Sequence, residues 1–184
     1  MTKTTRAINY DQGKKIAYKK IVEKEDIGKF ILLILETGLR IGDALALAKI
    51  NFHENDGGYF LKFTAQKTGK SAKRPVSKIL YESMTKSNNE KIFINPKTRK
   101  SYSKMWVGRK IKSCFLKELK EAKQEDMTIS AHSLRKSAGQ RVYEVNGIEA
   151  ARDFLQHQTY QTTKDYLCIG ERKLNILLSE TLID

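Results

Sequence analysis

The residues whose types and spacing best suit chemistry are a histidine and an arginine three positions apart, His132 and Arg135. Side chains at positions i and i+3 lie on one face of a helix. A guanidinium group offers a planar fork of donors that matches phosphate oxygens, and a histidine can exchange a proton near neutral pH. Alone, such a pair is more often a solvated helix face beside a half-buried histidine, so it needs further support.

A second arginine stands in the stretch T-G-L-R-I-G-D-A-L, which runs from Thr37 to Leu45. Gly38 is suited to end one helix in the left-handed conformation, so Arg40 begins the next helix and projects from a rigid corner. Asp43, one turn later, can hold the guanidinium group or cap the helix start. The plain alternative is a helix-turn-helix with an ordinary surface Arg–Asp pair.

A third feature is the sequence Leu155-Gln156-His157, followed on the next predicted helix by Tyr166. A tyrosine near the end of a sequence usually contributes to packing. It can also act as a nucleophile, provided that one group takes its proton and others stabilise the attacked centre.

The hydrophobic pattern predicts the elements that must position these residues. From Glu25 onward, apolar residues recur at three- and four-residue spacing and predict a helix that ends at Thr37-Gly38. Residues 59–64 and 73–77 predict two strands of a basic hairpin around the turn at Lys67–Lys70, with Pro75 indicating an edge strand.

The other predicted elements are helical. Val107, Ile111, Phe115 and Leu119 form a stripe on one long basic helix. Further helices are expected at residues 41–48, 132–145, 148–156, 160–168 and 171–182. The fold class is therefore mainly α with a small antiparallel β-sheet (α+β).

Composition points toward a polyanionic partner. The chain has 184 residues, which suits one domain, and 35 Lys+Arg against 21 Asp+Glu give a net charge of +14. Phosphate backbones attract such charge whatever their sequence, although a lysine-rich proteome would produce it too. Two cysteines and three histidines show no zinc spacing. The absence of a long apolar run or a secretory signal predicts a cytoplasmic protein without a membrane span.

Taken in order, T-G-L-R-I-G-D-A-L, H-S-L-R, L-Q-H and the final tyrosine resemble the signature of the tyrosine recombinase (phage integrase) family over residues 25–170. The resemblance implies the catalytic-domain fold of that family. It also implies a site-specific recombinase or integrase that cuts and rejoins double-stranded DNA through a 3′-phosphotyrosine, without metal, cofactor or ATP. The catalytic residues implied are Arg40, Lys67, His132, Arg135, His157 and Tyr166.

The resemblance also implies a role for each of these residues. The two arginines would clamp the phosphate, His132 would assist proton transfer, His157 would hydrogen-bond the scissile phosphate, and Tyr166 would be the nucleophile. The family's lysine sits on a hairpin turn and protonates the leaving oxygen, which indicates Lys67, with Lys70 as the runner-up. Acidic residues do not cluster as a metal-dependent nuclease would need, so activity in EDTA is expected.

The remaining expectations concern partners and domain limits. The residues expected to contact DNA are Lys70, Lys73, Arg74, Lys104, Arg109 and Lys136. Residues 1–24 are expected to form a basic linker or short helix, and residues 25–184 the catalytic domain. Residues 171–184 carry a leucine stripe that either docks on the chain's own core or, as in relatives, passes to a neighbouring subunit of a tetramer on DNA. The free protein would then be a monomer.

One departure and two alternatives remain. Gln156 stands where the family usually has glycine, which affects the end of that helix. A catalytically inactive DNA-binding relative would keep the scaffold, whereas a type IB topoisomerase uses a similar set of residues to relax supercoiled DNA. The presence of every expected reactive residue argues against decay.

Overall fold

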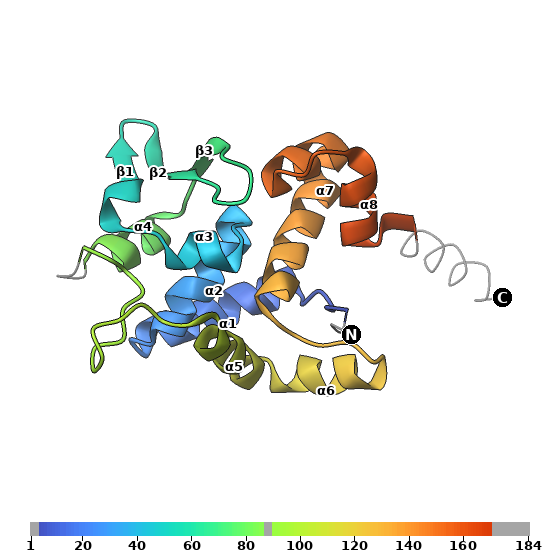
Figure 1. Cartoon of the computed structure of the whole chain (residues 1–184), viewed down its shortest axis with the longest axis horizontal. Coiled ribbons are helices and arrows are strands. Elements are labelled where there is room, and N and C mark those ends of the chain that lie inside the picture. Colours follow the sequence, from blue (N-terminus) through green and yellow to red (C-terminus); the bar gives the residue numbers. More distant parts are fainter. Residues whose placement is uncertain (1–3, 87–89, 171–184) are drawn as a thin grey trace. The chain divides into compact units, whose positions relative to one another are not determined.

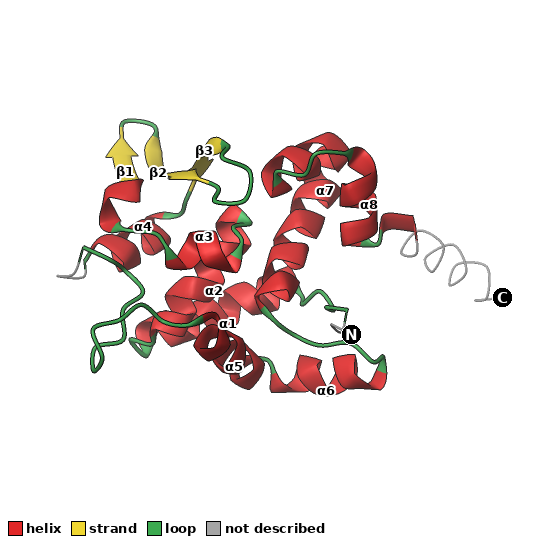
Figure 2. Cartoon of the chain, viewed as in Figure 1, coloured by secondary structure: helices red, strands yellow, loops and turns green. Residues whose placement is uncertain are grey.

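The computed structural model describes residues 4–86 and 90–170, which fall into two compact units, Met1–Ala138 and Gly139–Asp184. Figures 1 and 2 label the elements and their types. The described helices and strands are α1 (Tyr10–Val22), α2 (Asp26–Thr37), α3 (Ile41–Leu45), a 3₁₀ turn (Lys49–Asn51), β1 (Phe52–Asn55), β2 (Gly58–Thr64), β3 (Ser71–Pro75), α4 (Lys78–Thr85), α5 (Lys104–Cys114), α6 (Leu116–Gln124), α7 (Ala131–Leu155) and α8 (Tyr160–Leu167). The mainly helical prediction with a small antiparallel sheet is confirmed.

Helix α2 forms the centre of the first unit because nine of its twelve residues are buried. Its residues from Phe30 to Leu35 are all buried, and it contacts α1, α3, α4, α5 and β3. Gly28 lets α1 approach closely, since a Cβ there would lie 2.6 Å from the backbone nitrogen of Ile21. The predicted helix end is confirmed: Gly38 caps α2 in the left-handed conformation, with φ 65°.

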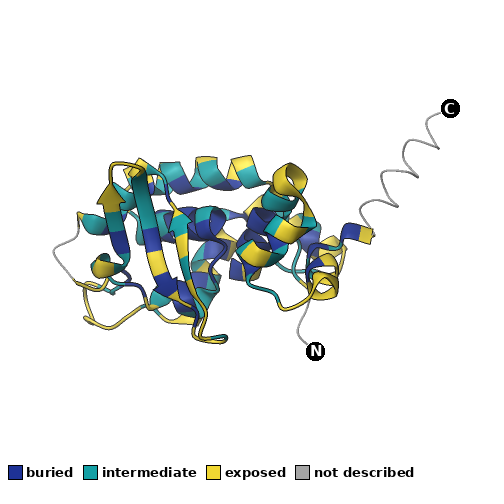
Figure 3. Ribbon diagram, turned by 90° about the horizontal axis from the view of Figure 1, so that it is seen from above, coloured by how far each residue is buried: buried dark blue, intermediate teal, exposed yellow. Residues whose placement is uncertain are grey.

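The three strands form one antiparallel sheet in the order β1-β2-β3. The prediction from Pro75 is confirmed, because β3 is an edge strand. Along β2, Leu61 and Phe63 are buried while Lys62 and Thr64 are exposed, an alternation that Figure 3 shows as bands along the strand. One face of the sheet therefore joins the core and the other faces solvent.

Two helix predictions need correction. The predicted long basic helix is broken between α5 and α6 at Phe115, whose φ of −121° and ψ of 49° are not helical. Phe115 is nevertheless fully buried, so packing sets this break. The helix expected at 41–48 ends at Leu45, and the 3₁₀ turn follows after Ala48.

The first described residues, from Thr4 onward, are tied to the first unit. Thr5 pairs with Thr128 in an isolated bridge, and the amide of Ile8 donates to Ser137 Oγ over 2.9 Å. Helix α1 packs on α2. The domain boundary expected after residue 24 stays a prediction. The helix expected at 171–182 lies outside the described residues, and no described helix is long and apolar enough to cross a membrane.

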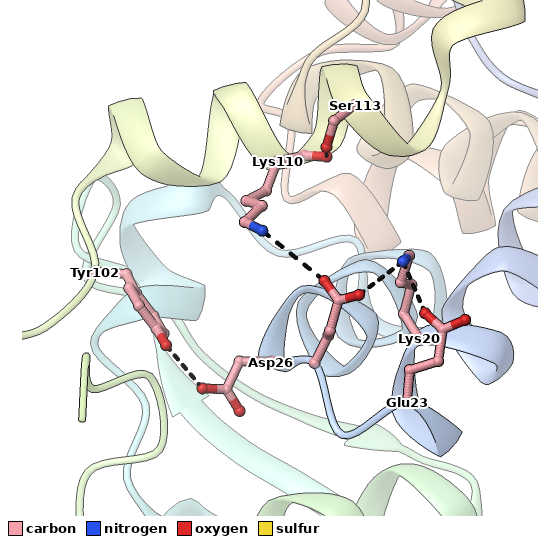
Figure 4. A network of polar contacts seen from close by, with 7 residues as sticks. Lys20, Glu23, Asp26, Tyr102, Lys110 and Ser113 are labelled. Atoms are coloured by element: carbon pink, nitrogen blue, oxygen red, sulfur yellow. Dashed lines mark hydrogen bonds and ion pairs between the residues drawn. The ribbon is translucent and has the colours of Figure 1, made fainter. Parts of the chain in front are cut away.

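A polar network ties α5 and its preceding loop to the α1–α2 connection (Figure 4). Lys20 Nζ lies 2.8 Å from Glu23 Oε2 and 2.7 Å from Glu25 Oε1. Tyr102 donates to Asp26 Oδ2 over 3.0 Å. Burial, together with the Asp26 carboxylate, raises the pKa of Tyr102 to about 12. Tyr102 therefore stays protonated and acts as a structural donor.

The second unit has a small core of its own. Helix α7 is interrupted at Gly147, whose φ of 83° and ψ of −178° divide it into two helical stretches. Ala151 and Leu155 of its second stretch are buried together with Leu167 of α8 and with Ile169, which follows α8.

Candidate active site

The first unit holds a group of residues that we call the arginine corner: Gly38, Arg40, His132 and Arg135. Arg40 stands directly before α3, in extended backbone that follows the left-handed Gly38. Arg135 reaches this corner from α7 and donates a hydrogen bond from Nη1 to the Gly38 carbonyl. At 5% exposure, Arg135 is buried. Arg135 thus stabilises the turn that positions Arg40.

Arg40 itself carries an unsatisfied donor. Its Nη1 atom is buried and has no hydrogen-bond partner among the described residues. A buried polar atom without a partner is rare and often marks a functional site. A guanidinium donor suits an anion with oxygen acceptors, such as a phosphate.

The pKa of His132 depends on its burial and on both arginines. Its pKa is lowered by partial desolvation of the ring and by the positive charges of Arg135 and Arg40. The residue as a whole is exposed, so solvent can reach it. At neutral pH its imidazole is therefore neutral and able to accept a proton.

The lysine turn is fastened to the arginine corner through Asp43. Asp43 is buried, and its Oδ1 accepts a hydrogen bond of 2.9 Å from the amide of Gln66. The turn itself closes through Gly69, whose amide donates to the Ala65 carbonyl over 2.8 Å. Asp43 thus ties α3 to the turn that presents Lys67. The sequence had suggested a guanidinium partner or a helix cap for Asp43 and missed this long-range bond.

Both candidate lysines of this turn, Lys67 and Lys70, are exposed. Lys67 directly follows the residue whose amide Asp43 holds, whereas Lys70 lies at the far end of the turn, beside β3. This placement favours Lys67 over the runner-up Lys70 as the candidate proton donor.

The second unit carries His157 and Tyr166. Their rings meet edge to face, with centroids 5.2 Å apart and planes at 88°. His157 Nδ1 lies 3.2 Å from Thr163 Oγ1, and Thr163 Oγ1 donates to the Thr159 carbonyl over 3.2 Å. Because the hydroxyl has a single proton, Nδ1–H of the histidine is the donor to Thr163. The buried threonine therefore fixes the orientation of the histidine ring.

The departure at Gln156 has a structural reading. Gln156 adopts a left-handed conformation with φ 52°, the region in which glycine is favoured. The amide of His157 bonds to the Arg152 carbonyl over 3.0 Å, which ends α7 and turns the chain toward α8. Glutamine therefore occupies a glycine-like backbone position at the cost of some strain.

The residues expected to contact DNA differ in exposure. Lys70, Lys73, Lys104 and Arg109 are exposed, whereas Arg74 is half-buried. Lys136 is only 7% exposed, which leaves little surface for a DNA contact. Lys104 approaches α3: a Cβ at Gly42 would lie 3.9 Å from its Nζ atom. One of these cations thus lies beside α3, the helix that Arg40 precedes.

The described residues therefore form two sets. Arg40, His132 and Arg135 come together in the first unit, with Lys67 on the turn tied to the same helix, and His157 and Tyr166 come together in the second. Neither set includes clustered metal ligands, because no group of three His, Cys, Asp or Glu side chains among the described residues could hold an ion. The chemistry that the sets support is charge neutralisation, proton transfer and phenol attack at a phosphate.

Comparison with solved structures shows which fold this is. The chain superposes on the XerH site-specific recombinase bound to palindromic difH, with a TM-score of 0.71 and 16% identity over 96% of this chain and 53% of that one. For the XerA recombinase the TM-score is 0.71, with 14% identity over 98% and 66%. For a lambda integrase dimer bound to a COC′ core site it is 0.64, with 20% identity over 91% and 49%. The fold is that of a tyrosine recombinase catalytic domain, as predicted.

The sequence also matches the model of the phage integrase family over residues 8–171. The chain therefore belongs to the phage integrase family. It spans about half to two thirds of the length of the three solved structures above. A comparison with curated protein sequences found no match.

Proposed function

We propose that this chain cuts and rejoins double-stranded DNA at specific sites through a covalent 3′-phosphotyrosine on Tyr166. Family membership supports the chemistry, and the arginine corner is the observation that carries it. A buried guanidinium donor of Arg40 has no partner within residues 4–86 and 90–170, and it lies next to a neutral histidine and a second arginine. A scissile phosphate supplies the missing acceptor.

In the proposed reaction, Tyr166 Oη attacks the phosphorus atom and gives its proton to the neutral His132. Arg40 and Arg135 hold the non-bridging oxygens, where negative charge concentrates in the transition state. His157, in its protonated form, donates from Nε2 to an oxygen of the same phosphate while its Nδ1–H stays bonded to Thr163. The bond to the 5′-oxygen breaks, and Lys67 donates a proton to that oxygen.

The product is a 3′-phosphotyrosine and a free 5′-hydroxyl. Rejoining reverses these steps with the 5′-hydroxyl of another strand, so no ATP and no metal are consumed. The proposal requires the arginine corner and the His157–Tyr166 pair to act on one phosphate. We propose further that the protein works as a homotetramer on DNA, is a monomer when free, and resides in the cytoplasm.

The test is covalent capture on nicked duplexes of randomised sequence, in which the short cleaved strand diffuses away and traps the intermediate. We expect a DNA adduct on denaturing gels in the presence of EDTA, and sequencing of the trapped DNA identifies the preferred site. Tyr166→Phe should abolish the adduct. Tyr160→Phe, on the same helix but with Tyr160 exposed, is the matched control and should retain it.

The alternatives give different results. A binding-only relative would shift DNA on native gels without a Tyr166-dependent adduct. A topoisomerase-like enzyme would form the adduct and relax supercoiled plasmid, yet would not recombine two copies of the captured site. An absolute requirement for Mg²⁺ would contradict the proposed chemistry.

A further inference from the structure

The exposed face of the sheet carries a set of residues that no catalytic role uses, which we call the outer sheet patch: Phe60, Lys62, Thr64, Ser71 and Lys73. In the β2–β3 register Lys62 pairs with Lys73, and Thr64 with Ser71. Both lysines and both hydroxyl residues are exposed. Like charges directly opposite each other destabilise a sheet. An anionic ligand bound to both ammonium groups would offset their repulsion, so this pairing suits an anion.

An aromatic ring organises these charges. Lys73 Nζ lies 3.8 Å from the centroid of the Phe60 ring, and Lys62 Nζ lies 5.6 Å from it. His53 of β1 stacks on the same ring, at 5.4 Å and an angle of 17°. Cation–π attraction keeps both ammonium groups over one spot of the sheet instead of letting them diverge.

The patch surrounds an open hollow. Its volume is about 540 Å³, and its lining includes both lysines, both hydroxyl residues and Asn51. Asn51 Nδ2 donates to the Lys62 carbonyl over 3.1 Å, and the Thr64 and Ser71 hydroxyl oxygens lie 3.0 Å apart. None of the described residues that line the hollow is a carboxylate. Ammonium and hydroxyl donors without a competing acid are suited to phosphate oxygens.

We propose that the outer sheet patch binds backbone phosphates of duplex DNA at a position separate from the scissile phosphate. The inference rests on the proposed function, because it takes DNA as the substrate. DNA is favoured over an acidic protein segment because β2 and β3 lead directly into the turn that carries Lys67, and because the whole chain carries a charge of +14. A duplex held at that turn continues past the strands beside it.

The experiment measures DNA affinity over a series of salt concentrations by fluorescence anisotropy. The patch variant is Lys62→Ala/Lys73→Ala, and the matched control is Lys15→Ala/Lys19→Ala, which removes two exposed lysines from α1. Loss of two phosphate contacts should weaken binding about tenfold and reduce the slope of log K against log salt by about 2. The control should keep the wild-type slope.

Phe60→Leu keeps both lysines but removes the ring that gathers them. We expect its affinity to fall by about two- to fivefold, the equivalent of an exposed cation–π interaction. Circular dichroism and thermal melting of each variant establish that the sheet remains folded, so a folded Phe60→Leu with wild-type affinity would contradict the organising role of the ring.

Covalent capture separates the two proposals. With saturating protein, the patch variant should still form the Tyr166 adduct, because the arginine corner is intact. If wild type forms the adduct but the patch variant binds DNA like the control, the patch inference is wrong and the proposed function stands. If wild type forms no adduct, the proposed function fails. If the patch variant loses binding to poly-L-glutamate and not to DNA, the surface serves an acidic protein and the inference is overturned.

Discussion

The two sets of candidate residues are held in different ways. The arginine corner adjoins a large core centred on α2, and Arg135 is itself buried. The His157–Tyr166 pair sits on a unit in which four buried apolar residues form the described core. Both helix ends that flank α8 use non-glycine residues in the left-handed conformation, Gln156 and Cys168.

This difference has a functional meaning. Groups that stabilise a transition state gain most from being preorganised, because they then pay no reorganisation cost during the reaction. A nucleophile has to enter and leave the phosphate, and elements with few buried contacts open at low free-energy cost. In the proposed reaction, a rigid electrostatic site therefore acts with a nucleophile, Tyr166, that lies on a weakly stabilised element.

The largest expected effect distinguishes the two arginines. Arg40→Ala and Arg135→Ala should each slow adduct formation by on the order of 10²–10³ in single-turnover assays. Only Arg135→Ala should also lower the free energy of unfolding, by about 1–3 kcal/mol, because Arg135 holds the Gly38 carbonyl while Arg40 Nη1 has no partner in the described part of the chain. Equal loss of stability in chemical denaturation would contradict this division of roles.

A pair of buried glycines tests how tightly each unit is packed. A Cβ at Gly28 would meet backbone atoms at 2.6 and 2.7 Å, whereas one at Gly139 would meet side-chain atoms of Leu155 at 2.8 Å and Leu167 at 3.1 Å. The leucine side chains near Gly139 can change conformation to make room for a methyl group. The backbone atoms near Gly28 can shift only at a larger free-energy cost. We expect Gly28→Ala to cost about 3 kcal/mol and Gly139→Ala about 1 kcal/mol.

Thermal melting measures both effects, with wild type as the reference. If Gly139→Ala proves the costlier of the two, the second unit is the more rigid one, and the contrast between the units is reversed.

The next effect concerns the ring of His157. Thr163→Val keeps the volume of the buried side chain but removes its bond to His157 Nδ1. We expect adduct formation to slow by about fivefold to tenfold, the equivalent of one hydrogen bond of ~1 kcal/mol. Thr162→Val is the control, since Thr162 is exposed on the same helix, and it should react at the wild-type rate.

Local signals in the sequence predicted one part of this arrangement and not the other. The corner at Gly38 and Arg40 followed from a helix that must end at a glycine, and the hairpin followed from its turn residues and edge proline. The break at Phe115 could not be predicted, because the apolar stripe continues across it and burial of its ring sets its backbone. The bond from Gln66 to Asp43 joins residues far apart in the chain, so no local pattern indicates it.

A smaller effect is expected at Gln156. A non-glycine residue in the left-handed region costs roughly 1–2 kcal/mol. Glycine would relieve this strain, but its greater conformational entropy in the unfolded chain offsets part of the stabilisation. We therefore expect Gln156→Gly to raise the free energy of unfolding by about 0.5–1 kcal/mol. A lower melting temperature would show that the glutamine side chain makes a contact worth more than the backbone strain.

The smallest effect is on the titration of His132, and it tests whether the arginine corner is one electrostatic unit. Because the pKa of His132 in the folded chain is lowered, its ring contributes no pH dependence to stability above the usual value of about 6.5, and stability is lost as the pH falls through the folded pKa. Arg40→Met removes one of the two positive charges and should raise the pKa of His132 toward its usual value, measured from the ring protons by NMR. Lys67→Met is the control and should leave that pKa unchanged, because desolvation and the charges of Arg135 and Arg40 lower it and the lysine turn does not. An unchanged titration in Arg40→Met would mean that desolvation and Arg135 keep the histidine neutral, and that Arg40 does not help to set the protonation state of the proposed proton acceptor.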